Sequence, residues 1–66
     1  MKYYKLLDND HKNTIIRANG RSQQKYVHDR GWVESGIMMK YFCDEDALFG
    51  LYEEISEKQA MQIIND

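Results

Sequence analysis

Apolar and polar side chains alternate through the first two thirds of the chain, in short segments separated by turn-forming residues. A period of two residues is typical of β-strands, because successive side chains of a strand point to opposite faces of the sheet. The pattern predicts strands over residues 2–7, 14–18 and 21–28, and Trp32-Val33 either extends the third strand or begins a fourth. Asn19-Gly20 predicts a type I′ hairpin turn, because both residue types tolerate the positive φ that this turn requires.

The apolar run over residues 37–43 has no clear period. Its length suits a strand, and we interpret it as one, although a buried helical segment of this length has the same composition. Cys43 closes the run, and as the only cysteine it forms no disulfide within the chain. Free cysteine is among the most buried residue types, so we expect Cys43 to be a buried structural thiol rather than a nucleophile activated by His11 or His28.

After this run the apolar residues fall at helical spacing. A capping box, Ser56-Glu57-Lys58-Gln59, predicts a final helix over residues 56–65. Before that helix we expect a short turn or helix at 44–50 and an extended link at 51–55, because Gly50 interrupts the helical pattern. The alternative is a single bent helix from residue 44 onward.

These elements together predict an α+β fold, in which a three- to four-stranded antiparallel β-meander carries a C-terminal helix packed on one face. At 66 residues the chain is one small domain, with the meander over residues 1–43 and an acidic, mainly helical segment over residues 44–66. A domain of this size buries only about 60% of the surface that its unfolded chain exposes, so we expect marginal stability and a homodimer. The expected core residues are Tyr4, Leu6, Ile16, Ala18, Val27, Trp32, Met61 and Ile64.

The charge is divided unevenly between these two parts of the chain. Residues 1–43 contain eight basic and four acidic residues, whereas residues 44–66 contain seven acidic residues and one base, Lys58. Such an asymmetry is typical of a polarised binding surface, although two solvated faces would have the same composition. The chain has no apolar stretch long enough for a signal peptide or a membrane span, and its single free cysteine suits a reducing compartment, so we expect a cytoplasmic protein without a membrane partner.

The residues that could support catalysis or metal binding match no known motif. Asp8, Asp10 and His11 lie close together, but Lys12 and Asn13 occupy positions where a calcium loop needs a ligand and a glycine. The glycines match neither a dinucleotide-binding motif nor a P-loop. We therefore expect no enzymatic activity, cofactor, metal ion or small-molecule substrate.

Aromatic and basic residues of the predicted sheet suit contact with another macromolecule. Tyr, Trp and Arg are enriched at protein interfaces and Met adapts to varied contacts, which makes Trp32, Tyr26, Met39 and Arg30 the candidate interface residues. Trp32 is either a core residue covered by the helix or an exposed anchor. A small sheet can instead bind single-stranded nucleic acid by stacking and phosphate contacts, for which the candidate residues are Lys5, Arg17, Lys25 and Tyr26.

The strand Lys2-Tyr3-Tyr4-Lys5, the later Gly31-Trp32-Val33 and the segment 52–60 together resemble short uncharacterised proteins of Gram-positive bacteria and their phages or other mobile elements. The resemblance implies an intracellular α+β protein and supplies no functional residues. We expect a non-catalytic protein-binding module, a small regulator or inhibitor encoded by a mobile element, that binds a host factor or a second copy of itself. The alternative is a small β-sheet protein that binds single-stranded nucleic acid.

Overall fold

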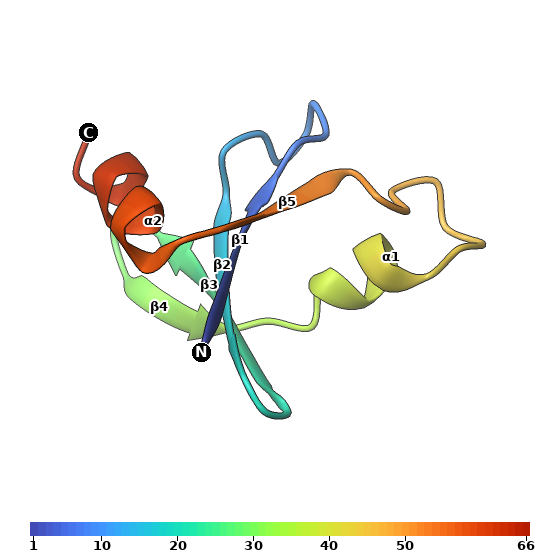
Figure 1. Cartoon of the computed structure of the whole chain (residues 1–66), viewed down its shortest axis with the longest axis horizontal. Helices are drawn as coiled ribbons and strands as arrows, with labels where there is room; N and C mark the ends of the chain where they lie inside the picture. The colour runs from blue at the N-terminus through green and yellow to red at the C-terminus, as the bar shows by residue number, and fades with distance from the viewer.

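The computed structural model describes all of residues 1–66 and contains one antiparallel sheet with two short helices (Figure 1). Its elements are β1 (Lys2–Leu6), β2 (Ile15–Asn19), β3 (Ser22–Val27), β4 (Gly31–Glu34), α1 (Met38–Phe42), β5 (Tyr52–Ile55) and α2 (Glu57–Ile64). The strand order is β4-β3-β2-β1-β5, so four strands form a meander and β5 pairs with the other side of β1. This arrangement confirms the α+β class, the meander and the C-terminal helix, and it adds a fifth strand. Neither helix has the length and apolar character that crossing a membrane requires.

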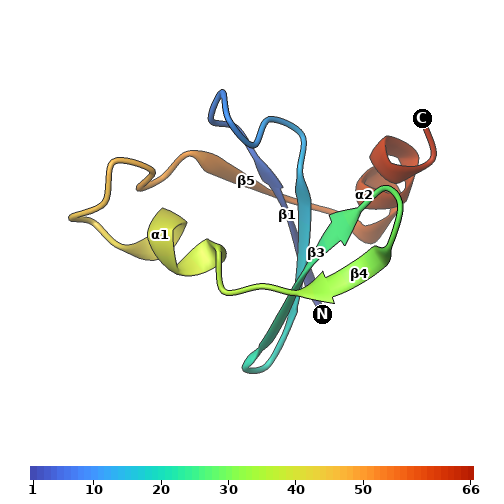
Figure 2. The ribbon, with the colours of Figure 1, turned by 180° about the vertical axis from the view of Figure 1, so that it is seen from behind.

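The strand β1 lies inside the sheet and is buried on both faces. Because neighbouring side chains of a strand point in opposite directions, Tyr4 and Leu6 face one side of the sheet and Tyr3 faces the other. The two helices lie on opposite sides of the sheet (Figures 1 and 2), and we name the faces after them, the α1 face and the α2 face. The predicted fold had only one covered face, and the helix α1 is the element that it lacked.

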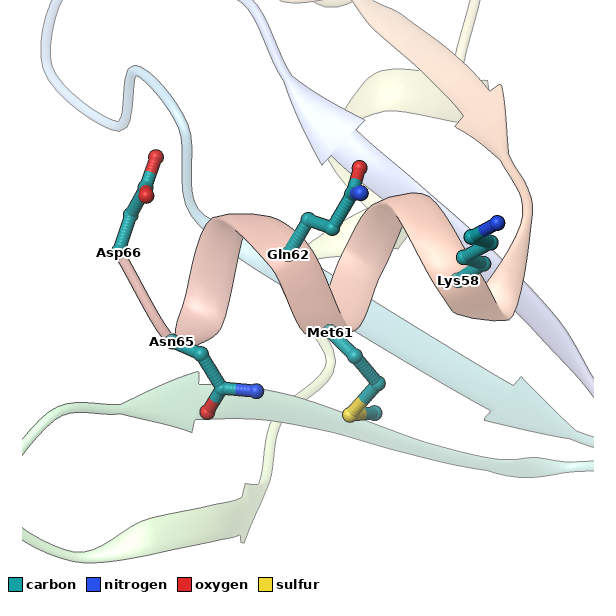
Figure 3. A pocket seen from close by; sticks show the side chains of 5 residues that line it. All are labelled: Lys58, Met61, Gln62, Asn65 and Asp66. Carbon is teal, nitrogen blue, oxygen red and sulfur yellow. The ribbon is translucent and has the colours of Figure 1, made fainter.

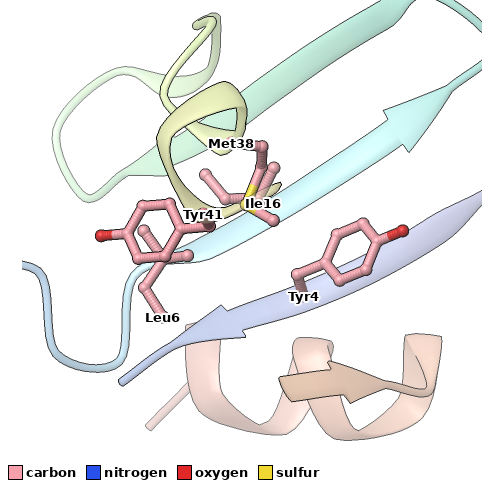
Figure 4. Packing of buried hydrophobic residues seen from close by; sticks show 5 residues of the cluster. All are labelled: Tyr4, Leu6, Ile16, Met38 and Tyr41. Carbon is pink, nitrogen blue, oxygen red and sulfur yellow. The ribbon is translucent and has the colours of Figure 1, made fainter. Parts of the chain in front are cut away.

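Each face has its own apolar cluster. The α1 face buries Tyr4, Leu6 and Ile16 against Met38 and Tyr41 of α1 (Figure 4). The cluster of the α2 face consists of Tyr3, Ile15, Ile55 and Ala60. The small chain thus gains a two-sided core from a single sheet, with β1 and β2 contributing to both sides.

The predicted core residues fall into three groups. Tyr4, Leu6 and Ile16 are buried, as expected. Partly buried against the clusters are Ala18, Trp32, Met61 and Ile64. The prediction for Val27 was wrong, because this residue ends β3 at the turn into β4 and belongs to neither cluster.

Residues 37–43 do not form the predicted strand, since α1 occupies most of this run. Met38 and Tyr41 lie three residues apart, so a helix directs both toward the sheet, whereas a strand would direct them to opposite faces. At the start of the helix, the Ile37 N–H donates a hydrogen bond of 3.3 Å to Ser35 Oγ. The prediction was wrong because so short an apolar run has no period that separates the two structures.

The hairpin between β2 and β3 turns one residue later than predicted. Asn19 pairs with Ser22, so the two central residues of the turn are Gly20 and Arg21. Of these only Gly20 has a positive φ, 62°, which is the pattern of a type II′ turn rather than a type I′ turn. The observed register keeps Tyr26 level with Ile15, against whose cluster it packs.

The C-terminal segment contains the final helix and a strand in place of the expected link. Ser56 caps α2, and the reciprocal bonds of the capping box are both present, with Gln59 N–H donating to Ser56 Oγ at 3.1 Å. The expected extended link forms β5, which pairs with β1 from Tyr3–Ile55 to Leu6–Tyr52. Residues 44–50 form turns, so the single bent helix is wrong.

Candidate protein-binding surface

Trp32, the first candidate interface residue, is partly buried on the α2 face. Its ring lies 5.4 Å from that of Tyr26 and 6.3 Å from that of Tyr3, both in edge-to-face geometry. The Arg17 guanidinium lies over the Trp32 ring, 4.3 Å from the ring centroid, at the distance of a cation–π contact. Trp32 therefore lies on the edge strand β4 and packs at the margin of the α2-face cluster.

We expect Trp32→Ala to destabilise the fold by about 1–2 kcal/mol, because a half-buried ring and its aromatic neighbours lose contact. The measurement is urea unfolding followed by far-UV circular dichroism. Arg17→Met keeps an apolar side chain and removes the cation–π contact together with the hydrogen bond to Gln24 Oε1, so it should cost about 1 kcal/mol. Equal stability of Trp32→Ala and the wild type would show that Trp32 contributes nothing to the core.

The four candidate interface residues do not form one surface. Arg30 is exposed in the turn between β3 and β4, two residues before Trp32. Met39 is 67% exposed on α1, which packs on the opposite face of the sheet from Trp32 and Tyr26. The aromatic pair and Met39 could therefore not bind one flat partner surface together.

The candidate nucleic-acid contacts are also divided between the faces. Strand register places Lys5, Arg17 and Tyr26 on the α2 face and Lys25 on the α1 face. Two of the three on the α2 face have partners within the chain: Lys5 Nζ lies 3.6 Å from Glu53 Oε2, and Arg17 Nε donates to Gln24 Oε1 at 2.7 Å. The basic residues do not form one exposed stripe that could follow a phosphate backbone.

A surface that the sequence did not indicate surrounds the beginning of β5. Four large apolar side chains are exposed there, and we call them the β5 rim: Leu7, Phe42, Phe49 and Leu51. Leu7 N–H donates to Leu51 O at 2.9 Å, which places these two residues side by side. The Phe42 ring lies 5.2 Å from the ring of Tyr52, the first residue of β5. Phe49 lies in the turn that precedes β5, two residues before Leu51.

The backbone of β5 is open along its outer side. Backbone hydrogen bonding alternates along an antiparallel pair of strands. Because Leu7 bonds to Leu51, the backbone N–H and C=O groups of Glu53 and Ile55 also point toward β1. The N–H and C=O groups of Tyr52 and Glu54 therefore point away from the sheet. Exposed carboxylates lie in this segment, at Asp44, Glu45, Glu53 and Glu54. The β5 rim thus joins apolar side chains, free backbone groups and negative charge.

Asp8 is the one buried charged residue, and it connects the loop after β1 to α1. Its carboxylate accepts hydrogen bonds from the Tyr41 hydroxyl and from His11 Nδ1, the latter at 2.8 Å. The Tyr41 hydrogen bond holds the pKa of Asp8 below its ordinary value of 3.8, and burial raises the pKa of Tyr41 above its ordinary value of 10.0. Both carboxylate oxygens of Asp8 accept hydrogen bonds within the fold, so this network holds the loop after β1 against α1.

Cys43 is exposed, which makes the prediction of a buried thiol wrong. Met38 and Tyr41 already occupy the inward positions of α1, and Cys43 follows the helix in extended conformation as the chain turns outward. No group of three or more His, Cys, Asp or Glu side chains converges as metal ligands would.

The hollows of the surface are shallow, and no more than half of the residues that line each of them are apolar. One lies along α2 and is lined by Lys58, Met61, Gln62, Asn65 and Asp66, of which Met61 alone is apolar (Figure 3). A binding pocket for a small molecule usually encloses its ligand between several apolar side chains, whereas this hollow is open and has one apolar residue. No protein-family model, curated protein or solved structure matches this chain.

Proposed function

We propose that this chain is a non-catalytic protein-binding module whose contact surface is the β5 rim. The observation that supports the proposal is that exposed apolar side chains flank the beginning of an edge strand with free backbone groups. Leu7 and Leu51 lie side by side, Phe42 packs on Tyr52 from the α1 face, and Phe49 lies in the preceding turn. Exposed apolar side chains next to an open strand suit a partner that adds an extended segment to the sheet. The surrounding carboxylates favour a partner segment that combines apolar and basic residues.

Single-stranded nucleic-acid binding is the weaker candidate. The exposed carboxylates around the β5 rim would repel phosphates, and the four basic or aromatic candidates lie on two different faces. Stacking of bases needs exposed rings, whereas Trp32 is partly buried and packs against the rings of Tyr3 and Tyr26.

The test is a pull-down from native host lysate, treated with nuclease, with the tagged wild-type chain and a Phe49→Ser/Leu51→Ser variant. The two side chains are 53% and 40% exposed, so the variant should keep the fold, as circular dichroism will check. We expect the wild type to retain one protein at fixed stoichiometry and the variant to lose it, with affinity at least about tenfold weaker.

Met39→Ser is the matched control, because it removes a more exposed apolar side chain that does not belong to the β5 rim. It should retain the same protein as the wild type. Undiminished capture by the Phe49→Ser/Leu51→Ser variant would contradict the proposal. Capture that disappears on nuclease treatment would favour nucleic-acid binding instead.

A further inference from the structure

The other edge of the sheet, β4, also has free backbone groups. Ser35 N–H donates to Gln23 O at 3.0 Å, and the register continues from this pair to Val33–Lys25 and Gly31–Val27. Alternation of bonding along an antiparallel pair then directs the backbone groups of Gly31 and Val33 toward β3. The N–H and C=O groups of the intervening residues, Trp32 and Glu34, point away from the sheet.

The two edges differ in what a second copy of the chain would meet. When two copies of one edge strand pair about a two-fold axis through their open backbone groups, the residue between the two open positions faces its own copy. On β5 that residue is Glu53, so two carboxylates would be opposed and would repel each other. On β4 it is Val33, and two opposed valines pack favourably across a sheet.

The charges on the α2 face also favour pairing through β4. In this register Trp32 lies opposite Glu34 of the partner subunit, and the reciprocal pair forms on the other side of the axis. The Arg17 guanidinium lies over the Trp32 ring, next to the place where that carboxylate would arrive. Within its own chain, Glu34 has only an exposed hydrogen bond of 3.3 Å from Ser22 Oγ. Its carboxylate is therefore available to a basic group across the edge.

We propose that the occupant of the β4 edge is a second copy of this chain, in an isologous dimer centred on Val33. Four backbone hydrogen bonds, two from each exchanged pair of Trp32 and Glu34, would join the two sheets into one. The strand is short, and interfaces that bury less than about 1,200 Å² are typical of weak association. We expect a dissociation constant between about 10 μM and 1 mM. The proposal does not depend on the β5 rim.

The experiment combines sedimentation equilibrium with amide hydrogen exchange of the full chain, measured by NMR from about 10 μM to 1 mM, the range set by the expected affinity. We expect the mass to rise toward that of a dimer while the Trp32 and Glu34 amides become protected. The Tyr52 and Glu54 amides serve as the internal control and should exchange equally at both concentrations. A monomer at the highest concentration, or protection at Tyr52 and Glu54 instead, would overturn the proposal.

Two variants test the geometry of the edge. Val33→Glu places opposed carboxylates on the axis. Glu34→Pro removes a backbone donor that points outward, and within the chain it costs only the exposed hydrogen bond from Ser22 Oγ. Each should weaken dimerisation by at least about tenfold. Glu54→Pro removes the equivalent donor on β5 and should leave dimerisation unchanged. If both β4 variants dimerise like the wild type, the β4 interface is wrong, whereas partner capture by the β5 rim is unaffected by either result.

Discussion

Replacing Ile16 by alanine is expected to destabilise the fold by about 3–4 kcal/mol, within the range for truncating a fully buried aliphatic side chain. Ile16 lies on β2, has no exposed surface, and packs with Leu6 of β1 and Met38 of α1. At roughly 0.05–0.15 kcal/mol per residue, a chain of this length has a free energy of unfolding of only about 3–10 kcal/mol. The substitution would therefore remove a large part of the total stability.

Urea unfolding measured by both far-UV circular dichroism and Trp32 fluorescence tests this expectation. Trp32 lies on the opposite face from Ile16, so equal midpoints for the two signals would show that the two clusters unfold together. Ile16→Val should cost about 1 kcal/mol and Met39→Ala close to nothing, because Met39 is exposed. A midpoint for Ile16→Ala equal to that of Met39→Ala would contradict the burial of Ile16.

Replacing Tyr41 by phenylalanine is expected to cost about 2–3 kcal/mol at neutral pH, because the buried Asp8 carboxylate loses a charge-assisted hydrogen bond. Tyr4→Phe is the matched control. Tyr4 is also buried on the α1 face, but its hydroxyl makes no hydrogen bond with another side chain. The control should change stability by less than about 0.5 kcal/mol. An equal loss in both variants would contradict a specific role for the Tyr41 hydroxyl.

The cost of Tyr41→Phe should also depend on pH. The Tyr41 hydrogen bond lowers the pKa of Asp8 in the folded state, so ionised Asp8 stabilises the fold above its ordinary pKa of 3.8. That stabilisation is lost as the pH falls from 3.8 through the lower folded value. The difference between wild type and variant, measured by urea unfolding, should be largest above about pH 5 and shrink below pH 3.8. A difference that stays constant across this range would show that Asp8 ionisation is not involved.

Local sequence signals predicted the elements that depend on neighbours along the chain. The capping box of Ser56 and Gln59 gave the correct start of α2, because both of its bonds lie within four residues. Turn-forming residues correctly separated the strands of the meander, and Gly20 marked the first hairpin to within one residue. These features are set by backbone preferences and short-range hydrogen bonds.

The features that the sequence did not predict depend on contacts between distant residues. Residues 51–55 pair as a strand only because β1 offers its second side, and this pairing also buries Tyr3 and brings Leu7 next to Leu51. With β1 assumed to be covered on one face, Tyr3 and Ile15 had no reason to be core residues. The β5 rim was missed for the same reason, since Phe42, Phe49 and Leu51 are far apart from Leu7 in sequence.

The pairing of β5 with β1 has a consequence for the order in which the chain assembles. The strands of the meander pair with their sequence neighbours, whereas β5 must close a loop that contains most of the chain, which carries a larger entropic cost. We therefore expect β5 and α2 to dock last and to open first, and their opening would uncover Tyr3 and Ile15. A partner that binds β5 only when it is paired with β1 would favour that paired state by mass action. Partner binding and the docking of β5 would then be coupled.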